Sequence, residues 1–136
     1  MNVLVDTCIV IDYLQMRAPF YDNARDLVMA VAGNQINGYI TAKSVTDIYY
    51  LMHRYFHDDI RTRNALSSLF KLFQVLDTTA LDCQLAILSP ISDYEDAVMV
   101  ETAARNGIDC IVSRNIHDYR NSSVPVYLPQ DFLQLL

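Results

Sequence analysis

The stretch Val3-Leu4-Val5-Asp6-Thr7 decides the fold, because a short apolar run ends abruptly at a carboxylate. Such a run is typical of a strand buried on both faces of a parallel sheet. Ligands of these sheets bind beyond the carboxyl ends of the strands, which is where Asp6 stands. Further strands are expected at Gly38–Thr41, Val75–Leu76, Ile108–Val112 and, at an edge because of its proline, Val124–Val126.

Segments with a helical repeat separate these strands. Their apolar residues recur every three to four positions, which predicts amphipathic helices. The expected helices cover residues 9–14, 21–32, 42–56, 60–73, 79–88 and 92–105, with a short one from Pro129. The helices at 42–56 and 60–73 are expected to form an antiparallel hairpin. This alternation predicts a three-layer α/β/α fold with a mostly parallel sheet, and 136 residues fit a single domain over 1–136.

Local signals predict finer details. Ser92 and Glu95 match a capping box, which makes Ser92 the expected N-cap and Asp93 a solvated neighbour. Asp12 is expected to be exposed on the first helix, and a place near a bound metal ion is the alternative. Asn106 and Gly107 are expected to end the helix that begins near Ser92.

Composition restricts the function classes. The net charge of −6 argues against a passive nucleic-acid coat, since such proteins bind phosphates through basic residues. Three widely spaced cysteines and no C-x-x-C pair favour reduced thiols over disulfides or zinc. No apolar run is long enough to span a membrane, and no signal peptide is evident, so a cytoplasmic location is expected.

Acidic residues follow several predicted strands. Asp6 follows the first strand, Asp47 lies beyond the second, and Asp96 lies in the first turn of a later helix. Asp118, in the loop after Ile108–Val112, can join them. Carboxylates packed together repel, and a hard divalent cation such as Mg²⁺ or Mn²⁺ removes that cost. These four aspartates are therefore the candidate catalytic residues, with Asp6 and Asp96 as metal ligands.

Each aspartate also has a plainer explanation. Asp6 could cap the helix that follows it, and an acid at the position of Asp96 is favoured by the helix dipole. Asp47 lies on a largely apolar helix, and aspartate is common in loops such as that of Asp118. Candidate substrate-binding residues near the same edge are Arg114, Asn115 and Lys43, with Arg17 as a further phosphate contact.

Four ordered motifs together resemble the PIN-domain family, in particular toxin ribonucleases of VapC type. The opening Leu4–Asp12 is similar to the family's first motif, and Ser44–Tyr49 to its second, which usually carries Glu where Asp47 stands. Asp93–Val98 resembles the third motif, and Ile111–Tyr119 resembles the closing Thr-Arg-Asp-x-x-Asp-Phe pattern.

The resemblance implies Mg²⁺- or Mn²⁺-dependent cleavage of RNA, a homodimer, and inhibition by an antitoxin protein that binds near the helical hairpin. It implies that Asp6 and Asp96 hold metal and that Asp47 supports them. Cys8 and Asn115 depart from the family pattern, Asn115 by replacing an acid.

Other functions stay open on the sequence alone. The departures at Cys8 and Asn115 motivate a degenerate PIN fold that binds RNA or protein without catalysis. A phosphoacceptor domain that uses Asp6 is disfavoured, since no second acid stands beside it. A dinucleotide enzyme is disfavoured further, because the chain has no G-x-G-x-x-G motif.

Overall fold

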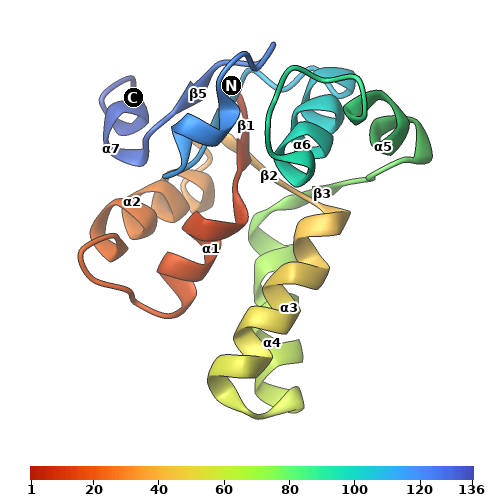
Figure 1. Cartoon of the computed structure of the whole chain (residues 1–136). Coiled ribbons are helices and arrows are strands. Elements are labelled where there is room, and N and C mark those ends of the chain that lie inside the picture. Colours follow the sequence, from red (N-terminus) through yellow and green to blue (C-terminus); the bar gives the residue numbers. More distant parts are fainter.

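The computed structural model describes residues 1–136 and contains one five-stranded sheet in which all neighbouring strands are parallel (Figure 1). In the sheet the strands run in the order β3-β2-β1-β4-β5. Their bounds are β1 Asn2–Val5, β2 Asn37–Thr41, β3 Gln74–Leu76, β4 Cys110–Val112 and β5 Val126–Tyr127. Helices cover both faces of the sheet, so the predicted three-layer α/β/α fold is confirmed.

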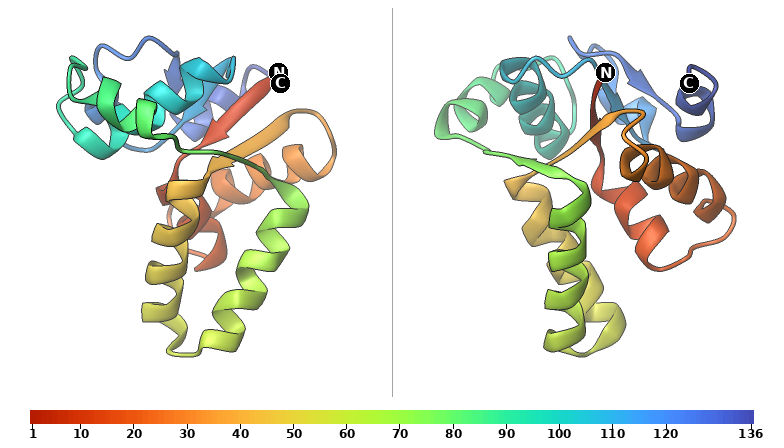
Figure 2. Two further views of the ribbon diagram at one scale, coloured as in Figure 1. Left: turned by 90° about the vertical axis from the view of Figure 1, so that its right-hand side faces the viewer. Right: turned by 180° about the vertical axis from the view of Figure 1, so that it is seen from behind.

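Seven α-helices and one 3-10 turn connect the strands. They are α1 Thr7–Leu14, α2 Tyr21–Ala32, α3 Ala42–Phe56, α4 Asp59–Leu72, α5 Ala80–Ala86, α6 Tyr94–Arg105, η1 Ile116–Tyr119 and α7 Pro129–Leu133. The predicted hairpin is α3 and α4, which extends away from the sheet in both views of Figure 2. No helix combines the length and the apolar character that crossing a membrane requires.

Successive side chains of the central strands point to opposite faces of the sheet, so the protein has two hydrophobic cores. Val3 and Val5 point into a core shared with α1, α2, α3, α4 and α7, whereas Leu4 points into a second core shared with α6. Leu4 pairs with Ile111 in β4, and both side chains are fully buried. Because both faces of β1 are covered, its apolar run and its fixed register follow directly from the sequence.

The strand order places a switch point between β1 and β4. From β1 the chain builds β2 and β3 on one side, and then returns to build β4 and β5 on the other. The two connections therefore leave in opposite directions beyond the carboxyl ends of β1 and β4. This divergence leaves a crevice beyond the strand ends, and open parallel sheets bind their ligands in such a crevice. Asp6 follows β1 there, and Ser113 follows β4.

Three local predictions are wrong. The N-cap of α6 is Asp93 and not Ser92, because the Asp93 carboxylate accepts a hydrogen bond from the Asp96 backbone N–H at 3.0 Å. Asp12 is buried and not exposed, because it is ion-paired with arginine. The edge strand begins at Val126 and not Val124, since Pro125 has no N–H to donate and offers only its carbonyl, to Ile111 at 2.8 Å.

Candidate metal centre

Asp6 is held by hydrogen bonds to one of its two carboxylate oxygens. Its backbone N–H donates to the Val112 carbonyl at 3.0 Å, which ties the end of β1 to β4. Ser113 Oγ donates to Asp6 Oδ2 at 2.6 Å, and the Tyr119 hydroxyl donates to the same oxygen at 3.0 Å. Asp6 stands at the N-cap position of α1 but makes no side-chain capping bond, so the capping explanation is wrong.

The second carboxylate oxygen of Asp6, Oδ1, has no hydrogen-bond partner within the chain. Every buried side-chain oxygen in the protein has a partner, so Oδ1 is open to solvent although Asp6 as a whole is buried. The side chain therefore presents one oriented, unneutralised oxygen to the outside. This is the form in which a carboxylate can serve as a ligand for a cation.

Asp96 lies in the first turn of α6 and faces the same space as Asp6. Burial, together with the nearby charges of Asp6 and Asp93, raises the pKa of its carboxyl to about 7. No arginine, lysine or histidine forms an ion pair with Asp96 or with Asp6. The two carboxylates therefore repel each other in the absence of an external cation.

Two cavities open on either side of this acid pair, and both are lined by Asp6, Thr7 and Asp96. The larger has a volume of about 580 Å³ and extends between α1 and the outer half of α3. Its wall includes Arg17, Arg54, Tyr55 and Asn115. The smaller has a volume of about 270 Å³, and its wall includes Lys43, Asp47, Tyr50 and Glu95.

Asp47 points into the smaller cavity and is engaged by a lysine. Lys43 Nζ lies 2.5 Å from Asp47 Oδ2 and 3.1 Å from Glu95 Oε2. Partial burial opposes the charge of Lys43, but the hydrogen bonds to the two carboxylates outweigh it and raise the pKa of this lysine. Asp47 is therefore neutralised within the chain, in contrast to Asp6 and Asp96.

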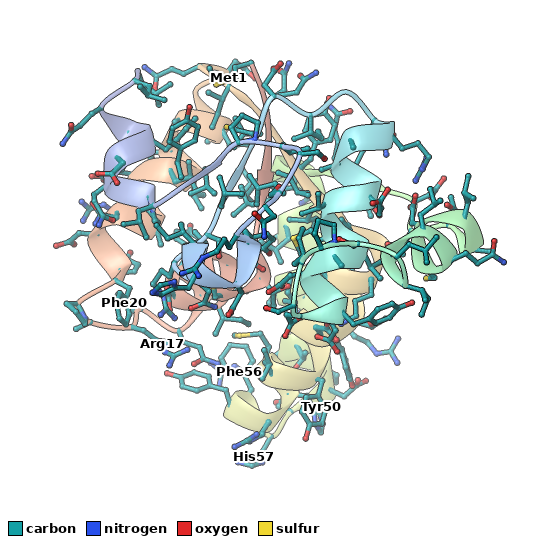
Figure 3. The ribbon with its side chains drawn as sticks, turned by 45° about the horizontal axis from the view of Figure 1, so that its top comes forward. Met1, Arg17, Phe20, Tyr50, Phe56 and His57 are labelled. Carbon is teal, nitrogen blue, oxygen red and sulfur yellow. The ribbon has the colours of Figure 1, made fainter.

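Arg114 is also engaged within the chain. Its Nε donates to Asp12 Oδ2 at 2.6 Å, and its second nitrogen donates to Asp12 Oδ1 at 3.2 Å. The guanidinium carbon lies 3.9 Å from the centre of the Phe20 ring, which covers its face. Figure 3 shows Phe20 and Arg17 on the segment that joins α1 to α2. Arg114 thus anchors the loop after β4 to α1 and has little freedom to meet a substrate.

The remaining predicted residues lie at the edge of the site. Asn115 lines the larger cavity, whereas the exposed Asp118 lines neither cavity. Asp118 acts on Asp96 only as one of the charges that raise its pKa. The structure thus brings Asp6 and Asp96 together, places Asp47 nearby on Lys43, and leaves Asp118 apart.

Several contributors were not among the predicted site residues: Tyr119, Glu95 and Arg54. Arg54 was within reach of sequence reasoning, because positions 43, 47 and 54 share one face of a helix. Tyr119 and Glu95 depend on contacts between distant segments, which periodicity does not reveal.

The donor set suits a hard cation that keeps part of its water shell. No three or more His, Cys, Asp or Glu side chains are gathered closely enough to enclose a metal ion. Mg²⁺ needs no such cage, since it binds through one or two carboxylates, waters and substrate phosphate. The Cys8 thiol lines the larger cavity, but burial and the charge of Asp6 raise its pKa to about 11. It is therefore protonated near neutrality and is no thiolate ligand.

Comparisons with known proteins agree with this fold. A toxin–antitoxin complex from Klebsiella pneumoniae is similar at a TM-score of 0.68 and 21% identity, covering 94% of this chain and 98% of that one. VapBC2 from Rickettsia felis, solved with a promoter DNA fragment, gives a TM-score of 0.66 at 14% identity over 94% and 98% of the two chains.

VapC20 of Mycobacterium tuberculosis, described as a toxin that cleaves the sarcin–ricin loop, gives a TM-score of 0.63 at 14% identity, covering 81% of this chain and 87% of that one. No curated protein sequence matches the chain. Residues 2–117, however, match the PIN domain family in sequence. This match spans Asp6 at the end of β1, the helix that carries Asp96 and the loop that carries Ser113. The chain therefore belongs to the PIN domain family.

Proposed function

We propose that this protein is an endoribonuclease that depends on Mg²⁺ or Mn²⁺ and acts as the toxin of a toxin–antitoxin pair. The observation that carries the proposal is the unneutralised pair Asp6 and Asp96 at the switch point of the sheet, between two cavities. Membership in the PIN domain family and the likeness of the fold to toxins such as VapC20 support it.

Asp6 and Asp96 would hold the ion. When bound, a divalent ion supplies Lewis-acid polarisation of the phosphodiester and makes water a stronger nucleophile. Ser113 and Tyr119 orient Asp6 by holding Oδ2, so that Oδ1 stays directed at the cavity. The Tyr119 hydroxyl remains protonated, because burial and the charges of Asp6 and Asp96 raise its pKa far above the usual value.

The larger cavity is the proposed path of the RNA. Arg54 and Arg17 line this cavity together with the acid pair, and Arg54 has no ion pair within the chain. Arginine can bind a phosphate through two parallel hydrogen bonds. Tyr55 beside them is exposed and can stack on an unpaired base, which favours single-stranded RNA or a loop.

Replacing Asp6 tests the catalytic proposal. We expect Asp6→Asn to lower the rate of RNA cleavage by at least about a hundredfold, because even an outer partner of a metal ligand contributes about 10–100-fold. Asp131→Asn, at an exposed position on α7, is the matched control and should cleave like the wild type. Thermal unfolding must show that both variants fold.

Equal cleavage by the wild type and Asp6→Asn would refute the proposed activity. A folded wild type that neither cleaves RNA nor binds Mn²⁺ would favour a non-catalytic PIN module, the function suggested by Asn115 in place of an acid.

The α3–α4 hairpin is the proposed place of an antitoxin. It exposes large apolar side chains, among them Tyr50, Tyr55, Ile60 and Phe70. Exposed apolar surface of this kind marks contact sites in soluble proteins. Co-purification of the chain with the product of a neighbouring reading frame tests this partner, and Ile60→Asp should weaken the complex. We also propose that the chain forms the homodimer that the family resemblance implies, and light scattering of the isolated chain tests it.

A further inference from the structure

Lys43 occupies an unusual position for a lysine. It lies in the first turn of α3, where the positive end of the helix dipole disfavours a cation. Its ammonium nevertheless stays within reach of two carboxylates, Asp47 on its own helix and Glu95 on α6. The contact to Glu95 links elements that are distant in sequence. The stability of α3 alone therefore does not explain why a lysine stands here.

The smaller cavity is where the charges of this site concentrate. Four carboxylates line it, and Lys43 is the one basic side chain among them. Asp47 and Glu95 flank the ammonium, whereas Asp6 and Asp96 lie on the same wall without an ion pair. The carboxylates thus fall into two pairs, of which one already has a resident cation.

We propose that the Lys43 ammonium takes the place of a second divalent cation, so that this site binds a single metal ion. The inference rests on the proposed function, which assigns that ion to Asp6 and Asp96. Two metal ions about 3.5–4 Å apart are a common arrangement in enzymes that cut phosphodiesters. Here a covalently tethered charge occupies the position between Asp47 and Glu95, and it cannot be lost by dilution or chelation.

The charges lining the smaller cavity explain why a second divalent ion would not bind. One ammonium and one divalent ion together leave the four carboxylates nearly neutral, so a second divalent ion would find little attraction and would face the ammonium directly. Removal of the ammonium reverses this balance. Asp47 and Glu95 would then be a free carboxylate pair, and a hydrated Mg²⁺ or Mn²⁺ needs no more than one or two carboxylates from the protein.

The number of Mn²⁺ ions bound tests the proposal. Calorimetric titration and electron paramagnetic resonance of free Mn²⁺ both count ions without requiring cleavage. We expect one ion per chain for the wild type and two for Lys43→Met. Lys43→Arg keeps the charge and should bind one ion. Lys71→Met removes the chain's other lysine, which is exposed at the end of α4, and should also bind one.

Two further variants keep the test decisive. Lys43→Gln replaces Lys43→Met should the latter fail to fold. Adding Glu95→Gln to Lys43→Met removes half of the new carboxylate pair and should return the count to one. Glu95 is largely exposed, so this change should not affect folding.

The outcomes separate the inference from the function on which it rests. A wild type that binds two ions, or neutral Lys43 variants that still bind one, would overturn the inference and leave the metal site of the proposed function intact. A wild type that binds none, while folded, would remove the proposed metal site and the inference with it.

Discussion

Neutralising Asp12 should destabilise the protein more than any exposed charge change. Asp12 is 1% exposed, and its carboxylate accepts both hydrogen bonds of the Arg114 fork, at 2.6 and 3.2 Å. Arg17 lies farther away, at 3.8 Å, and is half exposed, so it contributes little. Asp12→Asn keeps the shape of the side chain and removes its charge. The guanidinium of Arg114 is then left without a counter-charge.

The magnitude follows from the burial of this pair. Removing one partner of a buried ion pair costs about 3–5 kcal/mol, because the other charge stays desolvated. Arg114 is 24% exposed and keeps the face of Phe20, so the loss should be smaller, about 2–3 kcal/mol. With a urea dependence of about 1.5–2 kcal/mol per molar, the midpoint should fall by roughly 1–2 M.

Urea unfolding followed by circular dichroism in EDTA measures this effect without a contribution from metal. Asp22→Asn is the matched control, because Asp22 pairs with Arg25 on the exposed face of α2. This control should leave the midpoint unchanged. The double variant Asp12→Asn/Arg114→Met should be less destabilised than the two single variants combined. An Asp12→Asn midpoint equal to that of Asp22→Asn would refute the anchoring role of this pair.

Three other perturbations follow from the same geometry. The affinity for Mn²⁺ should fall about tenfold per pH unit below about pH 7, because protons compete with the ion for the Asp96 carboxylate. An affinity that calorimetry finds constant from pH 5 to 8 would contradict this. Tyr119→Phe removes a hydrogen bond to Asp6 Oδ2 and should weaken Mn²⁺ binding several-fold without unfolding the chain; unchanged binding would argue against orientation by this hydroxyl. The hydrogen bonds from Arg105 outweigh the effect of burial and hold the pKa of the Asp82 carboxyl well below its usual range. The stability that this pair contributes is present above about pH 4 and is lost in stronger acid, so Arg105→Met should unfold at a higher pH in acid titrations followed by circular dichroism. An unchanged acid midpoint would contradict the role of the pair.

Helices and strands could be predicted because their patterns are local. The bounds of α2 and α3 agree with the apolar repeat of the sequence, residue for residue. The predicted N-cap of α6 failed because Ser92 and Asp93 are both good caps, and the choice depends on which side chain meets the Asp96 backbone N–H. That contact depends on how the chain enters the helix, which a sequence window does not contain.

The sequence predicts which segments meet at one edge of the sheet, but it does not predict which charged side chains pair there. Parallel strands bring Asp6 and the loop after β4 to one edge, so their proximity follows from the strand assignment alone. Asp12 was expected to be exposed, and the pattern could not indicate that Arg114, distant in the sequence, would cover it. Lys43 and Arg114 were predicted as substrate contacts because they follow predicted strands at this edge, whereas in the structure both bind acids of the chain itself.

These internal ion pairs bear on how an acidic protein could cut a polyanion. An excess of carboxylates near the cleavage site would repel RNA unless the chain neutralised them locally. Asp12 has Arg114, while Asp47 and Glu95 share Lys43, so Asp6 and Asp96 are the only carboxylates lining the two cavities that lack an ion pair. A single divalent ion suffices to offset that pair. Attraction for the phosphate backbone would then appear only with the metal bound, so RNA binding measured with Asp131→Asn and Asp6→Asn should depend on Mn²⁺ in the first variant and stay weak in the second. Equal binding by the two variants would mean that the arginines of the larger cavity hold RNA without help from the ion.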